Sequence, residues 1–226
     1  MAVGTAKLEG ETALVAGGTR NIGLAIAQAL HAAGANVCVV GGSDPEALAS
    51  ALTELGGDNS KTTGLLADIT DEAAVTGAFE HAEQKFGAVS ILVNGPGYRP
   101  HGPFMDIDLA TWNSVLNIML TGPFLTCREF FRRMPTNRKG AIVNIGGLSA
   151  HRPAKNRAHV IAAKAGIVGL TKALAAEGIP SGGYTYPLYD NPMFDRETGR
   201  VEGAEGGFRC MPCPVPEWAC GEGGFN

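Results

Sequence analysis

The chain has few of the features that mark secreted, membrane-spanning or nucleic-acid-binding proteins. It has five cysteines among 226 residues, an odd number with no signal peptide ahead of it, so a disulfide framework is not expected. We see no 18-residue apolar run and no signal-peptide core, and therefore expect a cytoplasmic protein with no membrane partner. The net charge is −4, and no surface dense in Lys and Arg is predicted, so nucleic acid is not an expected partner.

The composition changes near residue 178. The last 49 residues contain ten Gly and six Pro but only seven Leu, Ile, Val or Phe, which is too few for a core of ordinary density. Residues 1–177 carry 15 acidic and 15 basic side chains, and residues 178–226 carry 7 and 3, so the net charge resides in the last segment. We predict a domain over 1–177 and an irregular tail over 178–226.

Residues 12–177 alternate between short β-branched runs and helical patterns. Apolar positions such as Ile22 and Ile26 repeat at helical spacing and stop at Gly34, and a second pattern from Ala47 stops at Gly56. This alternation predicts an α/β fold, a Rossmann-like doubly wound parallel sheet with helices on both faces. We expect five strands, the fifth forming an open edge unless the tail or a partner covers it. They are expected at residues 12–17, 35–40, 62–67, 89–94 and 141–146.

A glycine-rich loop follows the first expected strand. The stretch AGGTRNIG places Gly17, Gly18 and Gly23 between that strand and the first helix. Glycines there let the backbone approach a pyrophosphate, whose charge is stabilised by the helix N-terminus. Because this strand–turn–helix unit comes first in the chain, a nucleotide site is the favoured interpretation, and a purely structural turn is the alternative.

Several motifs, in order, resemble those of the short-chain dehydrogenase/reductase family. AGGTRNIG is similar to the family's T-G-x3-G-x-G, LLADITD to its Asp–hydrophobic pair, LVNGPG to its N-N-A-G, and KAGIVGLTKALAAE to its long interface helix. The resemblance covers about residues 8–177 and implies an NAD(P)-dependent oxidoreductase acting on a carbonyl or alcohol. The nucleotide-binding residues that it implies are Gly17, Thr19, Arg20, Asn21, Ile22, Gly23, Asp68, Ile69, Asn94, Gly95 and Lys164.

The choice between NAD and NADP depends on two places in the sequence. NAD-binding proteins carry a carboxylate at the end of the second strand, where it would repel the 2′-phosphate of NADP. This chain has Gly41 and Gly42 there, and Arg20 supplies a cation in the glycine loop. We therefore expect NADP, with NAD as the alternative, in which case Arg20 is a solvated loop residue.

The resemblance also implies four catalytic positions, and three of them lack the functional atoms. The family's Tyr, Ser and Asn fall on Val160, Gly147 and Met119, whereas its Lys falls on Lys164. We expect Lys164 to hold the nicotinamide ribose rather than to lower the pKa of a phenol. The pattern favours retained nucleotide binding with lost or altered chemistry.

Two residues near the vacant positions are candidate catalytic replacements. Ser149 lies two residues beyond the Ser position, and His159 adjoins the Tyr position and has a pKa suited to acid–base work near neutral pH. One residue of offset turns a helical side chain by about 100°, which favours a structural role for His159. Local capping is the alternative for Ser149. Tyr98, His101 and His151 are expected on loops at the same pocket.

Three functions remain open at this point. They are an NADP-dependent oxidoreductase for a small carbonyl or alcohol, a non-catalytic nucleotide-binding subunit, and a thiol-rich interaction module in the tail. We expect a homo- or hetero-oligomer assembled through helices at 109–134 and 156–177. Cys210, Cys213 and Cys220 form C-x2-C-x6-C, which suits zinc only with a fourth ligand from elsewhere. Free thiols are the alternative, and we assign no metal ligand.

Overall fold

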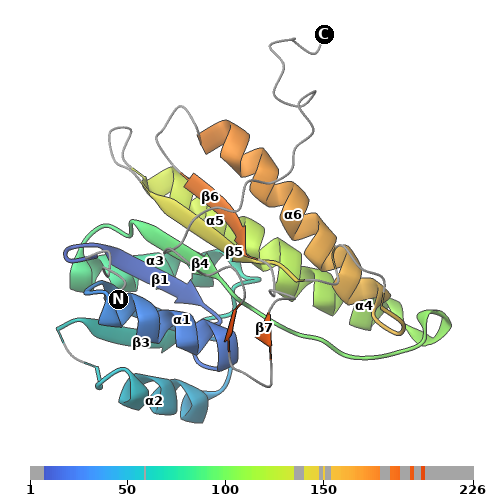
Figure 1. Ribbon diagram of the computed structural model, residues 1–226, viewed down its shortest axis with the longest axis horizontal. Coiled ribbons are helices and arrows are strands. Elements are labelled where there is room, and N and C mark those ends of the chain that lie inside the picture. The colour runs from blue at the N-terminus through green and yellow to red at the C-terminus, as the bar shows by residue number, and fades with distance from the viewer. Residues whose placement is uncertain are drawn as a thin grey trace, which may run out of the picture. The chain divides into compact units, whose positions relative to one another are not determined.

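Six parallel strands form the central sheet of the chain (Figure 1). The computed structural model describes residues 8–58, 60–134, 140–147, 150, 154–178, 184–188, 194–195 and 200–201. The strand order is β3-β2-β1-β4-β5-β6, so the order reverses direction between β1 and β4. The strands are β1 Thr12–Ala16, β2 Asn36–Gly41, β3 Thr62–Leu66, β4 Ile91–Asn94, β5 Ala141–Ile145 and β6 Tyr184–Leu188.

Helices connect these strands in the order that the sequence predicts. The Rossmann-like doubly wound fold is confirmed, since each of the first five strands is followed by a helical segment. The helices are α1 Asn21–Ala32, α2 Pro45–Glu54, α3 Glu72–Phe86, α4 Leu109–Leu116, α5 Gly122–Arg133 and α6 Ala158–Gly178, with short η1 Phe104–Asp106 and η2 Asn117–Thr121.

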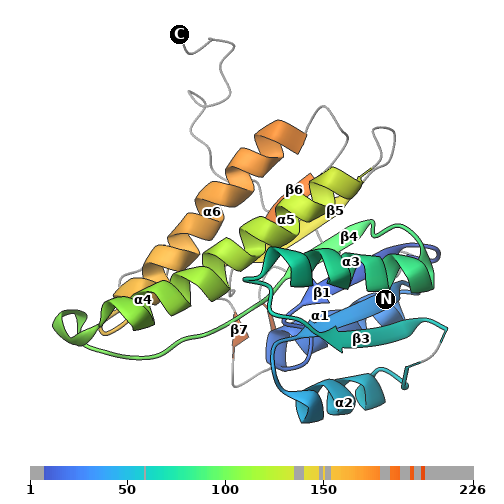
Figure 2. The same ribbon diagram turned by 180° about the vertical axis from the view of Figure 1, so that it is seen from behind.

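The central strands β1 and β2 are buried on both faces because their runs are continuously apolar. All five residues of β1 are buried, and successive side chains alternate between two core clusters. Leu14 packs in the cluster that α3 and α5 cover, and Val15 in the cluster that α1 and α2 cover. Figures 1 and 2 show this from opposite sides, with α1 in front of the sheet in the first and α3 and α5 in front in the second.

The predicted helix over 109–134 is two α-helices joined by a π-helical turn. The turn η2 runs from Asn117 to Thr121, and Pro123 stands in the first turn of α5. Proline has no N–H to donate and its ring clashes with the carbonyl four residues earlier, so a widened turn relieves the contact. Helical spacing alone could not show this change of pitch.

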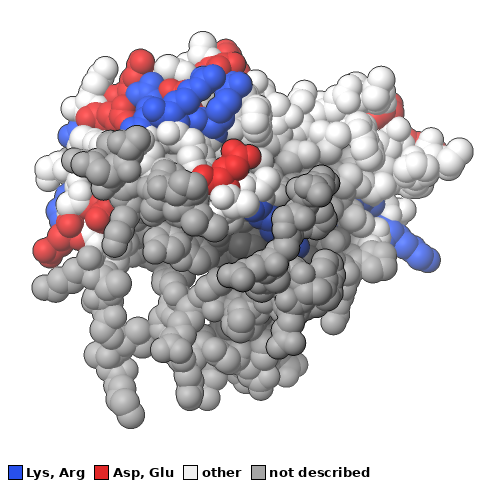
Figure 3. Space-filling model, turned by 90° about the horizontal axis from the view of Figure 1, so that it is seen from above, with Lys and Arg blue, Asp and Glu red and all other residues white. Residues whose placement is uncertain are grey.

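The charges on α5 are balanced by acids on its own surface and on α3. Arg128 pairs with Glu72, and Arg133 pairs with Glu83 and Glu129, both at 2.6 Å. On the face drawn in Figure 3, the largest group of Lys and Arg side chains likewise lies beside Asp and Glu side chains. The pair of Arg128 and Glu72 is partly exposed and contributes little stability, whereas Glu129 is buried and needs its partner Arg133.

The sixth strand corrects the expected boundary of the irregular tail. β6 lies within 178–226 and pairs in parallel with β5, Ala141 opposite Tyr184 and Ile145 opposite Leu188. It covers the strand edge that the five-strand prediction leaves open. Its run, YTYPL, contains Pro187, which has no N–H for a ladder, and an edge strand is where a sheet tolerates that loss.

Beyond β6, the described residues of the tail form one short strand pair. β7 Phe194–Asp195 and β8 Arg200–Val201 are antiparallel and belong to a second unit, residues 1–4 and 193–226. The cysteine pattern at Cys210, Cys213 and Cys220 lies outside the described residues, as do Ser149 and His151.

Helix α6 is the longest helix described. Its segment Ala158–Glu177 is long and apolar enough to cross a membrane by length and composition alone, although it includes Lys164 and Lys172. That criterion is weak evidence, because core helices also satisfy it. In α6 two polar side chains bond to β5: Lys164 to the carbonyl of Ile145, and Thr171 to Asn144 at 3.0 Å.

Candidate functional site

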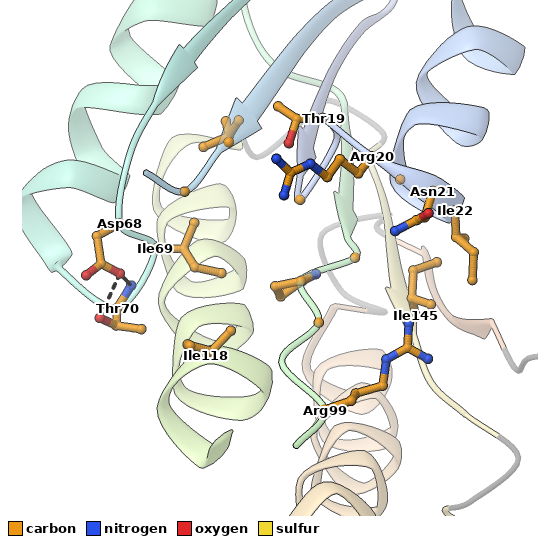
Figure 4. A pocket seen from close by; sticks show the side chains of 18 of the residues that line it. Thr19, Arg20, Asn21, Ile22, Asp68, Ile69, Thr70, Arg99, Ile118 and Ile145 are labelled. Atoms are coloured by element: carbon orange, nitrogen blue, oxygen red, sulfur yellow. Dashed lines mark hydrogen bonds between the residues drawn. The ribbon is translucent and has the colours of Figure 1, made fainter. Parts of the chain in front are cut away.

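A cavity of about 680 Å³ opens at the carboxyl ends of the strands, where the strand order reverses between β1 and β4. Ligands of doubly wound sheets bind at this place, and the volume suits a small-molecule ligand. The cavity brings together every nucleotide-binding residue implied by the resemblance except Asn94 (Figure 4). Those that line it are Gly17, Thr19, Arg20, Asn21, Ile22, Gly23, Asp68, Ile69, Gly95 and Lys164.

Gly17 and Gly18 in the loop between β1 and α1, and Gly23 in the first turn of α1, each lie where a Cβ would collide with backbone. Gly17 has φ +75°, and a Cβ there would lie 2.9 Å from the carbonyl carbon of Gly95. A Cβ at Gly23 would lie 2.0 Å from the carbonyl oxygen of Gly17. The loop therefore folds tightly against the start of α1, where the first backbone N–H groups have no carbonyl partner within the helix.

The N-terminus of α1 differs from those of the next three helices. Side chains of Asp44, Asp71 and Asp108 cap α2, α3 and α4 by accepting backbone N–H bonds of 2.9, 2.9 and 2.6 Å. No side chain caps α1 at Arg20, and its first turn contains no acid. The positive end of its dipole is thus left for an anion in the cavity.

Asp68 and Ile69 line the end of the cavity beyond β3, together with Ile118 of η2. The carboxylate of Asp68 accepts hydrogen bonds from the backbone N–H of Thr70 at 2.9 Å and from its hydroxyl at 2.8 Å (Figure 4). These bonds fix the turn that places Ile69 against the cavity. An apolar wall beside a fixed carboxylate suits the flat face and polar edge of a nucleobase.

Arg20 is paired with Asp44, a residue that the sequence analysis did not consider. Asp44 follows β2, and the pKa of its carboxyl is lowered by the N–H of Ala47 and then by Arg20. Both side chains are largely exposed. A Cβ at Gly42 would meet no atom within 4 Å, so the space expected for a 2′-phosphate is open.

Lys164 reaches the cavity from α6. Its side chain is 8% exposed, and its ammonium donates to the carbonyl oxygen of Ile145 at 2.5 Å. The bond holds the ammonium at the end of β5, where it lines the cavity with Ile145 and Gly146. A backbone carbonyl thus stabilises the charge of this buried lysine.

The positions of the family's Tyr and Asn are filled by a small apolar core. Val160 and Met119 are each 1% exposed and pack together with Val115 and Ala163. Neither residue lines the cavity, and Gly147 at the Ser position is buried. The side chains at these three positions, Val160, Met119 and Gly147, therefore supply no hydroxyl or amide group to the cavity.

His159 is buried rather than presented to the cavity. Its side chain is 1% exposed, it does not line the cavity, and Nδ1 has no hydrogen-bond partner among the described residues. His101 also lies outside the cavity, where its Nε2 accepts from Nε of Arg157 at 3.0 Å. The described part of the chain contains no group of three or more His, Cys, Asp or Glu side chains able to hold a metal.

Asn94 differs from the expectation that it lines the nucleotide pocket. Its side chain is 2% exposed and points into the core, where its amide donates to Asn144 at 2.9 Å and its oxygen accepts from Thr126 at 2.7 Å. Cys127 completes this network, and burial raises the pKa of its thiol to about 12. The network joins β4 to β5 and α5, so Asn94 has a structural position.

Three residues that line the cavity had no sequence pattern to identify them. Ser114 and Asn117 line it from α4 and η2, and Arg99 from the loop after β4. Asn117 stands two residues before the expected Asn position, and the π-helical turn alters which residues of this segment face the cavity. Loop residues such as Arg99 are placed by topology, which local sequence does not record.

The fold and the cavity define a dinucleotide-binding protein of the Rossmann type, with a glycine cradle and an uncapped helix at the switch point. The family model for short chain dehydrogenases matches residues 11–182. The chain belongs to the short-chain dehydrogenase/reductase family, whose members are NAD(P)-binding oxidoreductases.

Characterised relatives and solved structures agree with this assignment. The chain is 38% identical over 173 residues to D-threitol dehydrogenase of Mycolicibacterium smegmatis, covering 76% of this chain and 65% of that protein. It is 35% identical over 174 residues to 3-oxoacyl-(acyl-carrier-protein) reductase of Aquifex aeolicus, covering 77% and 70%. A dehydrogenase/reductase structure from Sinorhizobium meliloti superposes with a TM-score of 0.74 at 30% identity, covering 79% and 71%. The match thus spans about two thirds of these relatives' length.

Proposed function

We propose that the chain binds NADP(H) in this cavity and that the tyrosine-dependent hydride transfer of its family no longer operates in it. The observation that carries the proposal is the start of α1. Its N-terminus has no side-chain cap, and the glycines around it allow a tight loop that a Cβ would prevent by colliding with neighbouring backbone. An uncapped helix N-terminus at such a loop suits a pyrophosphate. When bound, the nicotinamide nucleotide supplies hydride chemistry.

The preference for NADP is supported by charge around the 2′-phosphate position. Gly42 carries no carboxylate, and Arg20 lies at the loop that would face the phosphate. Asp44 competes for Arg20, but this exposed pair is weak, and a dianionic phosphate forms stronger charge-assisted bonds with a guanidinium. NAD binding remains the alternative.

The loss of tyrosine chemistry is supported by the apolar core around Val160 and Met119. A phenol at position 160 would have to displace part of the cluster that Val160 forms with Val115, Met119 and Ala163. Lys164 retains its place and would hold the ribose hydroxyls. His159 is an unsuitable acid because its imidazole is buried away from the cavity.

The experiment is a paired measurement of binding and turnover. NADPH fluorescence is titrated with purified protein, and NADPH consumption is followed with a panel of small ketones and aldehydes. We expect saturable binding without turnover, whereas turnover that His159→Ala abolishes would contradict the proposal. Lys164→Met should weaken binding about tenfold, because it removes a charge-assisted hydrogen bond to the ribose.

A second candidate function is a nucleotide-binding subunit of a larger assembly. Leu109 of α4 and Phe124 of α5 are 73% and 42% exposed, on the segment expected to form an oligomer interface. The proposal of oligomerisation is tested by light scattering after gel filtration, where a monomer at micromolar concentration would contradict it. Cytoplasmic location is part of the same proposal.

A third candidate function is the thiol-rich interaction module in the tail. Zinc analysis of freshly purified, reduced protein tests it, and the absence of metal would contradict zinc binding there.

A further inference from the structure

Arg99 occupies the end of the cavity opposite the nucleobase side. It follows β4 and lines the cavity together with Ile145, Gly146 and Lys164. In Figure 4 its guanidinium extends from the loop towards Ile145 at the end of β5. Since Lys164 is expected to hold the nicotinamide ribose, this is the end at which a second ligand would meet the nicotinamide.

Among the residues whose side chains the structure describes, Arg99 makes neither an ion pair nor a hydrogen bond, which distinguishes it from the other arginines of that set. Arg20 is paired with Asp44, Arg157 with His101, and the α5 arginines with acids on α3 and α5. A guanidinium presents five N–H donors in a planar fork that matches a carboxylate or phosphate. The fork of Arg99 is available to a ligand in the cavity.

Among the described residues, the lining at this end of the cavity includes no acid. Asp106 and Asp108 follow Arg99 along the chain, but neither lines the cavity. Asp68 is the one described acid that does, and it follows β3, three strands away from β4, or about 14 Å across the sheet. Its carboxylate is also engaged by Thr70. The described charged side chains at this end are those of Arg99 and Lys164, so this part of the lining is positive.

We propose that the second ligand of this cavity is a small anion, a carbonyl or alcohol compound whose carboxylate or phosphate is held by Arg99. This inference rests on the proposed nucleotide site, because the pyrophosphate occupies the glycine loop and leaves Arg99 for the other ligand. A bidentate contact would orient the anion, and the positive charge of Lys164 would add attraction without direct contact. Neutral compounds of the same shape lose both contributions.

Matched charged and neutral probes test the proposal on the protein saturated with NADP⁺. Binding of acetoacetate is compared with that of methyl acetoacetate, and hydroxyacetone phosphate with hydroxyacetone, by ligand-observed NMR titration. We expect the charged member of at least one pair to bind about tenfold more tightly or better. Comparing the two charged probes distinguishes a carboxylate from a phosphate.

The variant Arg99→Gln should weaken binding of the charged probe about 10- to 100-fold, as expected for a lost charge-assisted contact. Binding of the neutral probe and of NADP⁺ should stay unchanged. Arg99→Lys should retain part of the affinity, because it keeps the charge without the fork. Lys155→Gln is the matched control: it removes an exposed positive charge from the segment before α6 that does not line the cavity.

Two results would overturn the inference. Equal affinity for charged and neutral probes, or equal loss in Arg99→Gln and Lys155→Gln, would show that Arg99 does not recognise an anion. A fall of NADP⁺ affinity in Arg99→Gln would assign its guanidinium to the dinucleotide instead. Failure of the wild-type protein to bind NADP⁺ is measured first and would contradict the proposed function separately.

Discussion

Arg20 and Gly42 are the residues at which cofactor preference should be decided. Arg20 has a competing partner in Asp44, and Asp44 also caps α2, so its position is fixed by two contacts. Gly42 adjoins them in open space and has no left-handed backbone angle. A side chain can therefore be introduced at position 42 without strain.

Gly42→Asp should invert the preference from NADPH to NADH. The new carboxylate would repel a 2′-phosphate and accept hydrogen bonds from a ribose 2′-hydroxyl, which favours NADH by about tenfold or more. The ratio of the two dissociation constants, measured by fluorescence titration, checks the prediction. Gly42→Asn is the control of equal size, and an unchanged ratio in Gly42→Asp would place the 2′ position elsewhere.

Among the elements, α4 and α6 determine what the catalytic region can do. Helix α6 places Lys164 at the cavity. On the same helix, Val160 and Ala163 pack against Val115 and Met119. The same helix pair thus preserves the nucleotide contact and fills the space for a phenol.

Val160→Tyr should destabilise the protein and restore no turnover. The larger ring overpacks a filled core, at a cost of about 1–3 kcal/mol, which lowers the Tm by roughly 2–12 °C for a chain of this size. Thermal unfolding and NADPH consumption are measured together. Val160→Thr, nearly equal in volume to valine, separates the effect of the hydroxyl. Turnover in Val160→Tyr with wild-type Tm would show that the position is open.

Asp108 links the stability of α4 to pH. The N–H of Thr111 lowers the pKa of Asp108 below its ordinary value of 3.8. A lowered folded pKa adds stability above the unfolded value, and this contribution disappears as pH falls through the folded value. Asp108→Asn keeps a good cap without the charge. The free energy of unfolding of Asp108→Asn, measured with urea, should therefore depend less steeply on pH below about 4 than that of the wild type. Asp106→Asn, in η1, is the control, and equal acid dependence in wild type and Asp108→Asn would refute this role.

The elements were largely predictable, because continuous apolar runs such as TALVA and NVCVV admit little besides buried strands. β6 was missed because Pro187 and the Gly- and Pro-rich residues around it resemble a loop, and pairing with β5 is a tertiary effect. In the site, the glycine loop is predicted from its place between the first strand and the first helix, and Lys164 from the resemblance to the family. Arg99 and Asn117 are not, since a loop and a π-helical turn place them. Asn94 was misplaced because a strand-end side chain can face either the cavity or the core.

In the molecule as a whole, a cavity suited to a dinucleotide lies next to an apolar cluster that fills the positions of the family's Tyr and Asn. The cradle depends on the uncapped N-terminus of α1, and Asn21 is the first residue of that helix and lines the cavity. An acid at this position would stabilise the helix dipole and repel a pyrophosphate at the same time. An acid at position 21 should therefore leave the protein as stable as before or more stable, and should weaken dinucleotide binding.

Calorimetric titration of NADPH into wild type and Asn21→Asp tests this central claim, with Asn113→Asp as a control of equal charge on the exposed side of α4. We predict saturable binding by wild type and by Asn113→Asp, and affinity about tenfold weaker or worse in Asn21→Asp, with its Tm unchanged or raised. Wild-type protein that is folded but binds neither NADPH nor NADH would contradict the account, as would Asn21→Asp binding as tightly as wild type.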